Sequence, residues 1–529
     1  KQTTSLLPAK QEPRTEGPTN IRGGGIPIIT PSTANTSCTT SASIMSTTSE
    51  IDEAHNESGT SAVPKPLHLL HPFHEDNSKY DDGDGDNNNN AWSPPAYDRT
   101  WLTQLLERHS SDPRLTKYYN NLHETYPILK KKALVVAPMV DQSDLPFRLL
   151  CRDYGANLCF TPMVHAKMFT DMKGYRKKFW SYVDGTPASD RPLIVQLCGS
   201  DKKSLLYTIK YIIESKNGVD GIDLNCGCPQ TIAKRGMYGA FLLEKDNGDA
   251  IVDIVSYLVK EVGHLIPISV KVRILPSGVE DSLKLYGRLV DAGAAMLTVH
   301  GRTRLQKTYK TGHADWDAIK RTVELYSHRV PILSNGSIAN LDDVVSCLQH
   351  TGADGIMSSE SILEYPPIFT ETGTAAVEGK RTGPSRLEIA RQYLRYCEEY
   401  PPDKAGQGSG MKCIRAHFHR ILHADLGKYH DVRTEVAYGR SMETFWKVCD
   451  DVQAMQDVEG HDGTEETLSW YMRHRIPQDN DDNDDNATQQ QVNDREEEKK
   501  SVDPDEADAL NCTNLFGGGD DDDDGEQCW

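Results

Sequence analysis

The sequence predicts an α/β protein whose main domain is a (β/α)8 TIM barrel, followed by a small C-terminal helical domain and flanked by disordered N- and C-terminal arms. Three observations predict this class. Between residues 134 and 369, short apolar runs alternate eight times with longer amphipathic stretches. Polar residues stand at or just after the ends of these runs. Both ends of the 529-residue chain are instead polar and acidic, with little apolar periodicity.

The eight apolar runs are the expected strands. Each is hydrophobic throughout, as is typical of a parallel strand that is covered on both faces. The stretches between them are the expected helices, and several begin with a residue type that commonly caps a helix. The expected strands are residues 134–137, 158–161, 193–197, 221–224, 268–272, 296–300, 331–334 and 355–358, and the expected helices include 200–215, 249–262, 281–292 and 341–349.

This alternation alone does not distinguish a closed barrel from an open, doubly wound sheet. The polar residues at the strand ends favour the barrel, because a barrel brings the C-terminal ends of all its strands around one mouth, where barrel enzymes keep their chemistry. These residues are Pro138, Met139, Gln196, Asn225, Lys271, His300, Asn335 and Ser358. We therefore expect the barrel over residues 134–370.

Helical patterns flank the expected barrel. Residues 96–133 form a helical lead-in, and residues 385–475 form a small domain with helices over 386–399 and 411–426. The segment 412–420 (KCIRAHFHR) places cations on more than one helical face. These cations indicate either a solvated helix surface or a surface that binds an anionic partner.

Net charge is distributed unevenly along the chain. Of the total of −20, the arm at residues 1–95 carries −6 and the acidic tail at residues 479–529 carries −16, which leaves +2 for the middle. Few apolar residues and many like charges favour disorder in both arms. Because the middle is nearly neutral and rich in Lys and Arg, the acidic total does not exclude nucleic acid as a partner.

The twelve cysteines show no regular spacing in a chain of this size, which favours a reducing compartment, and we expect a cytoplasmic or nuclear location. No run of about 18 apolar residues is present, so we expect no membrane span. We also expect a monomer.

Cys226 and Cys228 lie in the segment 225–229 (NCGCP), just after an expected strand. Two thiols without a second Cys or His pair fall short of a zinc site, so no metal is expected. A thiol between Gly227 and Pro229 suits a nucleophile or a proton donor, and its ordinary pKa near 8.5 keeps it mostly protonated at neutral pH. The alternative is an inert, buried cysteine on a tight turn.

Two cations and two turns complete the expected mouth. Lys271 and His300 end neighbouring strands, where a cation would stabilise negative charge on a bound ring. Taken singly, each residue is more often a surface cation or a satisfied core histidine. Residues 335–337 (NGS) and 355–360 follow the last two strands, where barrels frequently form a phosphate site from backbone N–H groups. A phosphate-bearing cofactor is therefore expected, although an Asn-Gly turn alone is more often only a turn.

Six segments resemble the dihydrouridine synthase family. They are 136–143 (VAPMVDQS), 191–197 (RPLIVQL), 223–230 (DLNCGCPQ), 232–236 (IAKRG), 299–303 (VHGRT) and 334–337 (SNGS). Their order and spacing agree with the family from about residue 134 to residue 369, and the wording is similar to the eukaryotic subgroup that acts on D-loop uridines 16 and 17. The resemblance implies FMN in the barrel, NADPH as the reductant, and a helical domain that binds tRNA.

The resemblance also implies a role for each matching residue. It places the flavin ring against residues 138–140, Gln196, Lys271 and His300, and the flavin phosphate against the turns after the last two strands. The residues expected to bind FMN are Pro138, Met139, Val140, Gln196, Lys271, His300, Asn335, Gly336, Ser337, Ser359 and Glu360.

For the substrate, the resemblance implies that Asn225 and Arg273 contact the uracil. Hydride would reach C6 of the ring while Cys228 protonates C5. The target base must leave its stack, and poorly paired D-loop nucleotides make this easier.

The chain departs from the subgroup at Ser361, where a glycine is common, so the phosphate site is expected to differ there. Cys226 is a second thiol close to the expected acid. Two other functions stay open: a flavin enzyme acting on a small molecule, such as a dihydroorotate dehydrogenase or an ene-reductase, and a non-catalytic barrel that binds RNA. The basic helical domain argues against the first, and bound flavin would argue against the second.

Overall fold

The computed structural model describes residues 97, 99–184, 187–214, 218–306, 311–374, 380–402, 410–461, 464 and 471. They belong to one compact unit that spans residues 66–529. The expected arms at residues 1–95 and 479–529 lie outside the described residues.

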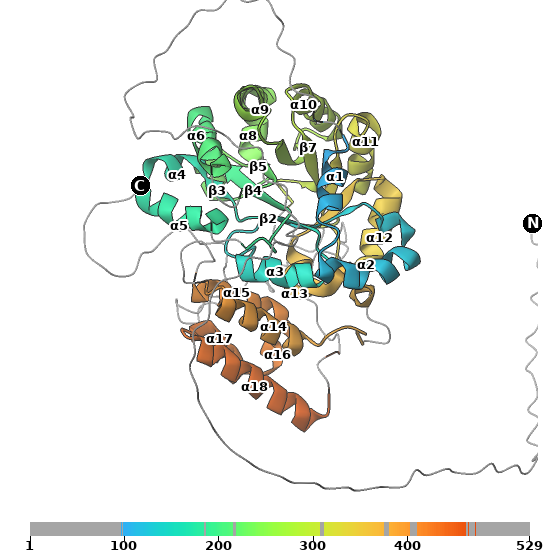
Figure 1. Cartoon of the computed structure of the whole chain (residues 1–529), viewed down its shortest axis with the longest axis vertical. Coiled ribbons are helices and arrows are strands. Elements are labelled where there is room, and N and C mark those ends of the chain that lie inside the picture. Colours follow the sequence, from blue (N-terminus) through green and yellow to red (C-terminus); the bar gives the residue numbers. More distant parts are fainter. Residues whose placement is uncertain are drawn as a thin grey trace, which may run out of the picture. The chain divides into compact units, whose positions relative to one another are not determined.

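The described strands form a closed parallel barrel, which confirms the predicted fold (Figure 1). Neighbours pair in the order β2-β1-β9-β8-β7-β6-β5-β4, and a β2–β4 ladder closes the ring. The short β3 pairs with the carboxyl-terminal end of β4. The strands are β1 (Ala133–Val136), β2 (Leu158–Phe160), β3 (Val164–His165), β4 (Leu193–Cys198), β5 (Gly221–Cys226), β6 (Ile268–Ile274), β7 (Met296–Thr303), β8 (Ile332–Asn335) and β9 (Gly355–Ser358).

Three strands run at least two residues further than the sequence predicts. β5, β6 and β7 end at Cys226, Ile274 and Thr303, two or three residues beyond their apolar runs. The residues near these strand ends still pair with the neighbouring strand: Asn225 pairs with Lys271, and Arg273 pairs with His300. Backbone pairing does not require apolar side chains, and the strands therefore carry polar side chains up to the mouth.

Helices surround the strands in the alternation that the sequence predicts (Figure 1). Caps fix several boundaries: Asp201 accepts the N–H groups at the start of α6, Asn340 caps the start of α12, and the left-handed Gly352 caps its end. The barrel helices are α3 (Leu145–Asp153), α4 (Ala166–Asp171), α5 (Lys173–Asp184), α6 (Lys202–Ile213), α7 (Thr231–Arg235), α8 (Ala240–Glu244), η2 (Lys245–Gly248), α9 (Asp249–Val262), α10 (Val279–Asp291), α11 (Trp316–Tyr326), α12 (Leu341–Thr351), α13 (Glu360–Glu364), η4 (Pro366–Phe369) and η5 (Glu371–Gly373).

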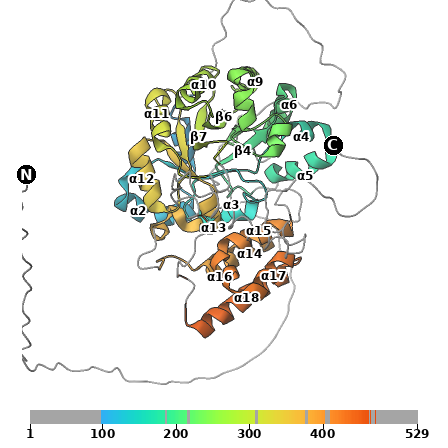
Figure 2. The ribbon, with the colours of Figure 1, turned by 180° about the vertical axis from the view of Figure 1, so that it is seen from behind.

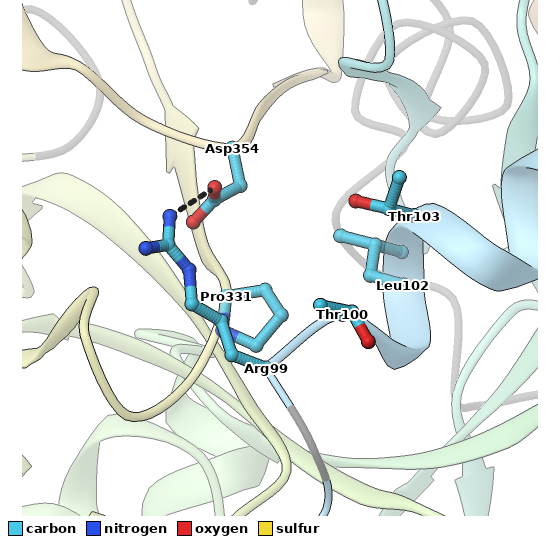
Figure 3. A pocket seen from close by; sticks show the side chains of 6 residues that line it. All are labelled: Arg99, Thr100, Leu102, Thr103, Pro331 and Asp354. Atoms are coloured by element: carbon cyan, nitrogen blue, oxygen red, sulfur yellow. Dashed lines mark hydrogen bonds and ion pairs between the residues drawn. The ribbon is translucent and has the colours of Figure 1, made fainter.

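The helical lead-in consists of α1 (Trp101–Arg108), α2 (Pro113–Thr125) and η1 (Pro127–Leu129). Leu102 and Leu106 of α1 join the apolar side chains inside the barrel, and Trp101 donates to the carbonyl of Ala295 at 2.8 Å. Ala295 precedes β7, so α1 covers the amino-terminal end of the barrel. A cavity of about 280 Å³ lies beside it (Figure 3), where Arg99 bonds Asp354 at 3.0 Å.

Among the described residues, five helices follow the barrel: α14 (Arg386–Glu399), α15 (Met411–Ile421), α16 (His423–Lys428), α17 (His430–Tyr438) and α18 (Met442–Glu459), labelled in Figure 2. The single helix predicted over residues 411–426 is wrong, because the chain leaves helical geometry at Leu422. Apolar spacing continues across this break, so the sequence does not reveal it.

The helices after the barrel share a hydrophobic core with it. Phe147 of α3 stacks on His417 of α15, with ring centroids 4.3 Å apart. The buried Asp144 carboxylate accepts hydrogen bonds from Tyr393 at 3.1 Å and bonds His417 at 2.7 Å. In the described part of the chain, none of the helices combines the length and hydrophobicity that crossing a bilayer requires.

Candidate active site

Polar side chains lie in layers inside the carboxyl-terminal half of the barrel. The ladders place Gln196, Asp223 and Ser269 side by side on β4, β5 and β6, and Asn225 and Lys271 pair one level closer to the mouth. Asp223 is fully buried, accepting a hydrogen bond from Gln196 Nε2 at 2.8 Å and one from Ser269 Oγ at 2.7 Å. Burial raises the pKa of this carboxyl to about 6.

Asn225 connects this lower layer to the turn at residues 227–229, which follows β5 and is called the cysteine turn. Its Nδ2 donates to Gln196 Oε1 at 2.8 Å and to Met163 Sδ at 3.3 Å. Its Oδ1 accepts the N–H groups of Gly227 at 3.2 Å and Cys228 at 3.0 Å. All four hydrogen-bonding positions of the amide are therefore used within the protein. This arrangement favours a role in fixing the turn, and the predicted contact with substrate stays a prediction.

Cys228 is half-buried just beyond β5, where it packs against a small apolar cluster that contains Cys198 and Tyr238. Its carbonyl accepts the N–H of Ala240 at 3.0 Å. Gly239 has φ +65°, and a Cβ there would lie 2.6 Å from that carbonyl oxygen, so the close crossing requires glycine. Burial raises the pKa of the Cys228 thiol, which keeps it protonated and suits it to donating a proton.

Cys226 faces the other way. It is the last residue of β5, fully buried, and belongs with Leu224 to the core between strands and helices. Burial raises the pKa of its thiol. The two cysteines therefore lie in separate apolar clusters. No group of three metal-binding side chains occurs among the residues that the structure describes.

Lys271 extends from β6 into the mouth. Its ammonium group donates to Asn335 Oδ1 at 2.9 Å, and Asn335 Nδ2 donates to the carbonyl of Met357 at 2.8 Å. Burial, and secondarily the charge of Arg273, lowers the pKa of Lys271 to about 8. A half-buried cation whose ammonium group has donor hydrogens beyond this bond favours an anionic or electron-rich ligand.

Arg273 fixes the cysteine turn from the opposite side. Its Nε donates to the carbonyl of Gly227 at 2.8 Å, and another of its nitrogens donates to Thr303 at 2.9 Å. Burial, followed by the charge of Arg302, lowers the pKa of Arg273 to about 10. Its predicted contact with substrate stays a prediction, because these bonds hold the guanidinium against the protein.

His300 lies 3.3 Å from the guanidinium of Arg302, measured from Nε2 to Nη1. A guanidinium only donates, so Nε2 accepts and the ring proton of neutral His300 is on Nδ1. The buried Arg302 also donates to the carbonyl of Gly312 at 2.7 Å and to Ser337 Oγ at 3.2 Å.

The turn after β8 has the features of an anion site. Gly336 has φ +111° and Ser337 has φ +60°, and a Cβ at Gly336 would lie 3.0 Å from the ring of His300. Both residues are buried, yet their backbone N–H groups donate to no acceptor among the described residues. Buried N–H groups without acceptors are rare, and successive ones in a turn bind phosphate in many proteins. The turn therefore fits the predicted phosphate site.

The other predicted cofactor residues lie on neighbouring loops of the mouth. Pro138, Met139 and Val140 follow β1 and are half-buried, and Ser143 accepts the N–H of Met139 at 3.0 Å. Arg148 donates to the carbonyl of Ser143 at 2.6 Å. These hydrogen bonds from Ser143 and Arg148 hold the loop after β1 in place.

Ser359 and Glu360 follow β9 and begin α13. The unexpected residue is Ser361, which is buried and lies 2.8 Å from Ser358 Oγ, measured between hydroxyl oxygens. It also donates to the carbonyl of Ile338. The hydroxyl therefore connects the β9 loop to the turn after β8, which carries Gly336 and Ser337.

Two residues without a predicted role, Asp223 and Arg302, hold the predicted ones in place. An acidic residue in the middle of an apolar strand was the available signal for Asp223, since such a charge needs a partner. A second cavity, of about 550 Å³, lies between η2 and α10 and is lined by Glu244, Asp281 and Arg288 among others. It contains none of the predicted site residues.

Comparisons with known proteins show which family this chain belongs to. The family described as Dihydrouridine synthase (Dus) matches residues 135–458. The tRNA-dihydrouridine(16/17) synthase [NAD(P)(+)] of Saccharomyces cerevisiae is 41% identical over 303 residues, which cover 57% of this chain and 68% of that protein. The protein of the same name from Schizosaccharomyces pombe is 35% identical, covering 59% of this chain and 75% of its own length. The rat protein named tRNA-dihydrouridine(16/17) synthase [NAD(P)(+)]-like is 38% identical over 58% of this chain and 64% of its own length.

Proposed function

Because the chain belongs to the dihydrouridine synthase family, we propose that it reduces uridine to 5,6-dihydrouridine in the D-loop of tRNA, at positions 16 and 17, using NADPH and bound FMN. The relatives at 35–41% identity carry names that state this activity and these positions. A tRNA substrate also fits the expected cytoplasmic or nuclear location.

The residues of the mouth fit FMN. The N–H groups of Gly336 and Ser337 would bind the phosphate. Lys271 has donor hydrogens beyond its bond to Asn335, and the Gln196 amide uses one N–H and one lone pair in its bonds to Asp223 and Asn225. The second N–H and lone pair of Gln196 suit a ring edge that offers both an acceptor and a donor. When bound, reduced FMN supplies the hydride for C6 of the uracil.

Cys228 would complete the reaction by giving its thiol proton to C5. The raised pKa of the thiol keeps the proton available at neutral pH. Asn225 and Arg273 hold the turn on two sides, through the N–H groups of Gly227 and Cys228 and the carbonyl of Gly227. A donor fixed in this way needs little reorganisation when the base arrives.

The helices after the barrel would bind the tRNA backbone. Arg415, Arg420 and Arg433 surround His419 on α15 and α17, and burial together with these charges lowers the pKa of His419 to about 4. So dense a group of cations is costly in isolation and suits a polyanion.

The single observation that carries the proposal is that a barrel of this family brings Cys228, Lys271 and the Gly336 turn to one mouth. The test is incubation with an unmodified tRNA transcript, FMN and NADPH or NADH, followed by mass-spectrometric mapping of dihydrouridine. We expect dihydrouridine at positions 16 and 17, formed faster with NADPH. Product confined to other positions would overturn the position, and no product in any tRNA would overturn the activity.

A further inference from the structure

Asp223 has no solvent-exposed surface, yet three successive hydrogen bonds connect it to Cys228. Its side chain is fully buried in the middle of β5. Its two oxygens accept from Gln196 Nε2 and Ser269 Oγ. Gln196 then accepts from Asn225, and Asn225 accepts from the N–H of Cys228.

These bonds all have the same direction. A backbone N–H only donates, so the Asn225 atom that faces Cys228 must be its oxygen. The Asn225 nitrogen then faces Gln196 and needs an oxygen there, which turns the Gln196 nitrogen toward Asp223. A carboxylate only accepts, so it ends the series without a conflict. A side chain without an acceptor at position 223 would leave a buried N–H of Gln196 unpaired.

We propose that Asp223 is a positioning residue that fixes the orientation of the Gln196 and Asn225 amides and thereby the position of Cys228. The inference deepens the proposed function and rests on it for its catalytic consequence. Its structural consequence, an ordered cysteine turn, does not depend on which reaction the protein performs.

The alternative is that Asp223 acts through its charge, which partly offsets that of Lys271. Asp223→Asn separates the two explanations. The asparagine keeps an oxygen for Gln196 and turns its nitrogen toward Ser269, whose hydroxyl then donates to the carbonyl of Ile222 at 3.3 Å. This variant therefore removes the charge and keeps the hydrogen-bond direction, whereas Asp223→Leu removes both at similar volume.

The experiment is hydrogen exchange of the protein without added cofactor, read by mass spectrometry on peptides that contain residues 227 and 228. Asp223→Leu should increase exchange of these amides about tenfold, and Asp223→Asn should leave it near wild type. Ser269→Ala is the matched control, since it removes a different bond of Asp223. Gln196→Met removes the hydrogen bonds that Gln196 makes to Asp223 and Asn225. It should also increase exchange at residues 227 and 228, which keeps the test informative if Asp223→Leu does not fold.

Reconstituted variants supply the second readout. With saturating FMN, Asp223→Leu should lower kcat by about 10- to 100-fold with little change in KM for tRNA, and Asp223→Asn should keep most of kcat. Equal exchange at residues 227 and 228 in wild type, Asp223→Leu and Gln196→Met would overturn the inference. An equal increase in exchange and an equal loss of kcat in Asp223→Asn and Asp223→Leu would assign the effect to the charge of Asp223 and would also overturn the inference. Altered exchange in a protein that forms no dihydrouridine would support the inference while the proposed function fails.

Discussion

At its amino-terminal end the barrel is filled by Leu102 and Leu106 of α1 and by apolar interior side chains, whereas toward its mouth the interior holds Asp223, Lys271 and Asn335. The side chains that fill the barrel interior at this end carry no charge, and their burial stabilises the fold. The polar end holds a half-buried lysine whose pKa is lowered to about 8 and a fully buried aspartate whose pKa is raised to about 6. These shifts mean that folding disfavours the charged forms of both groups. The polar residues of the mouth therefore lower the stability of the fold, while they are positioned to bind a ligand.

The largest expected effect concerns the mouth. Cys228→Ala should lower the rate of dihydrouridine formation by about 10²- to 10⁴-fold, because the proton donor is lost, while bound flavin is retained. The measurement is dihydrouridine per tRNA against time. Cys226→Ala is the control, since that thiol faces the outer core, and it should keep the rate while losing about 1 kcal/mol of stability. Equal rates in the two variants would contradict the assignment.

The converse change is made at the amino-terminal end. Leu102→Ala removes a buried side chain that is 2% exposed and should lower the free energy of unfolding by about 2–5 kcal/mol, without changing kcat below the unfolding transition. Denaturant unfolding checks this. Leu325→Ala, at a leucine that is 46% exposed, should change stability by less than about 0.5 kcal/mol. A large loss of kcat in Leu102→Ala would show that the two ends are coupled.

Lys271→Met tests whether the mouth binds at the expense of stability. Loss of a charge-assisted contact should weaken flavin binding by about 10- to 100-fold, while the protein without flavin keeps or gains stability, because a desolvated cation is gone. Fluorescence titration with FMN and thermal unfolding give the two values. Lys284→Met, at an exposed lysine, should change neither. Unchanged FMN affinity in Lys271→Met would remove this residue from the cofactor site.

The pH dependence of stability and of flavin affinity tests the same group. The pKa of Lys271 is about 8 when folded and near 10.5 when unfolded, so the unfolded state binds more protons between these values. Wild type without flavin should therefore gain stability relative to Lys271→Met as pH rises from about 8 to 10.5. Flavin affinity should fall over the same window as the charge is lost. A stability difference that is flat with pH would show that Lys271 is not desolvated.

The sequence predicted the barrel because its strands are continuous apolar runs, and β9 and α9 begin and end at the predicted residues. It placed most predicted site residues at or beside the mouth, since strand ends converge in a barrel. It underestimated the lengths of β5, β6 and β7, because their polar C-terminal residues still pair with the neighbouring strands. It missed the break at Leu422, because apolar spacing continues across it. It gave no role to Asp223, because the partners of a buried charge depend on which residues the ladders bring alongside it.

The most direct test of the account is anaerobic absorbance spectroscopy of the purified protein after reconstitution with FMN. NADPH should bleach the flavin bands, and addition of unmodified tRNA should restore them with one dihydrouridine formed per flavin reoxidised. A protein that binds no flavin, or reduced flavin that tRNA leaves bleached, would contradict the proposal that this mouth reduces uridine in tRNA.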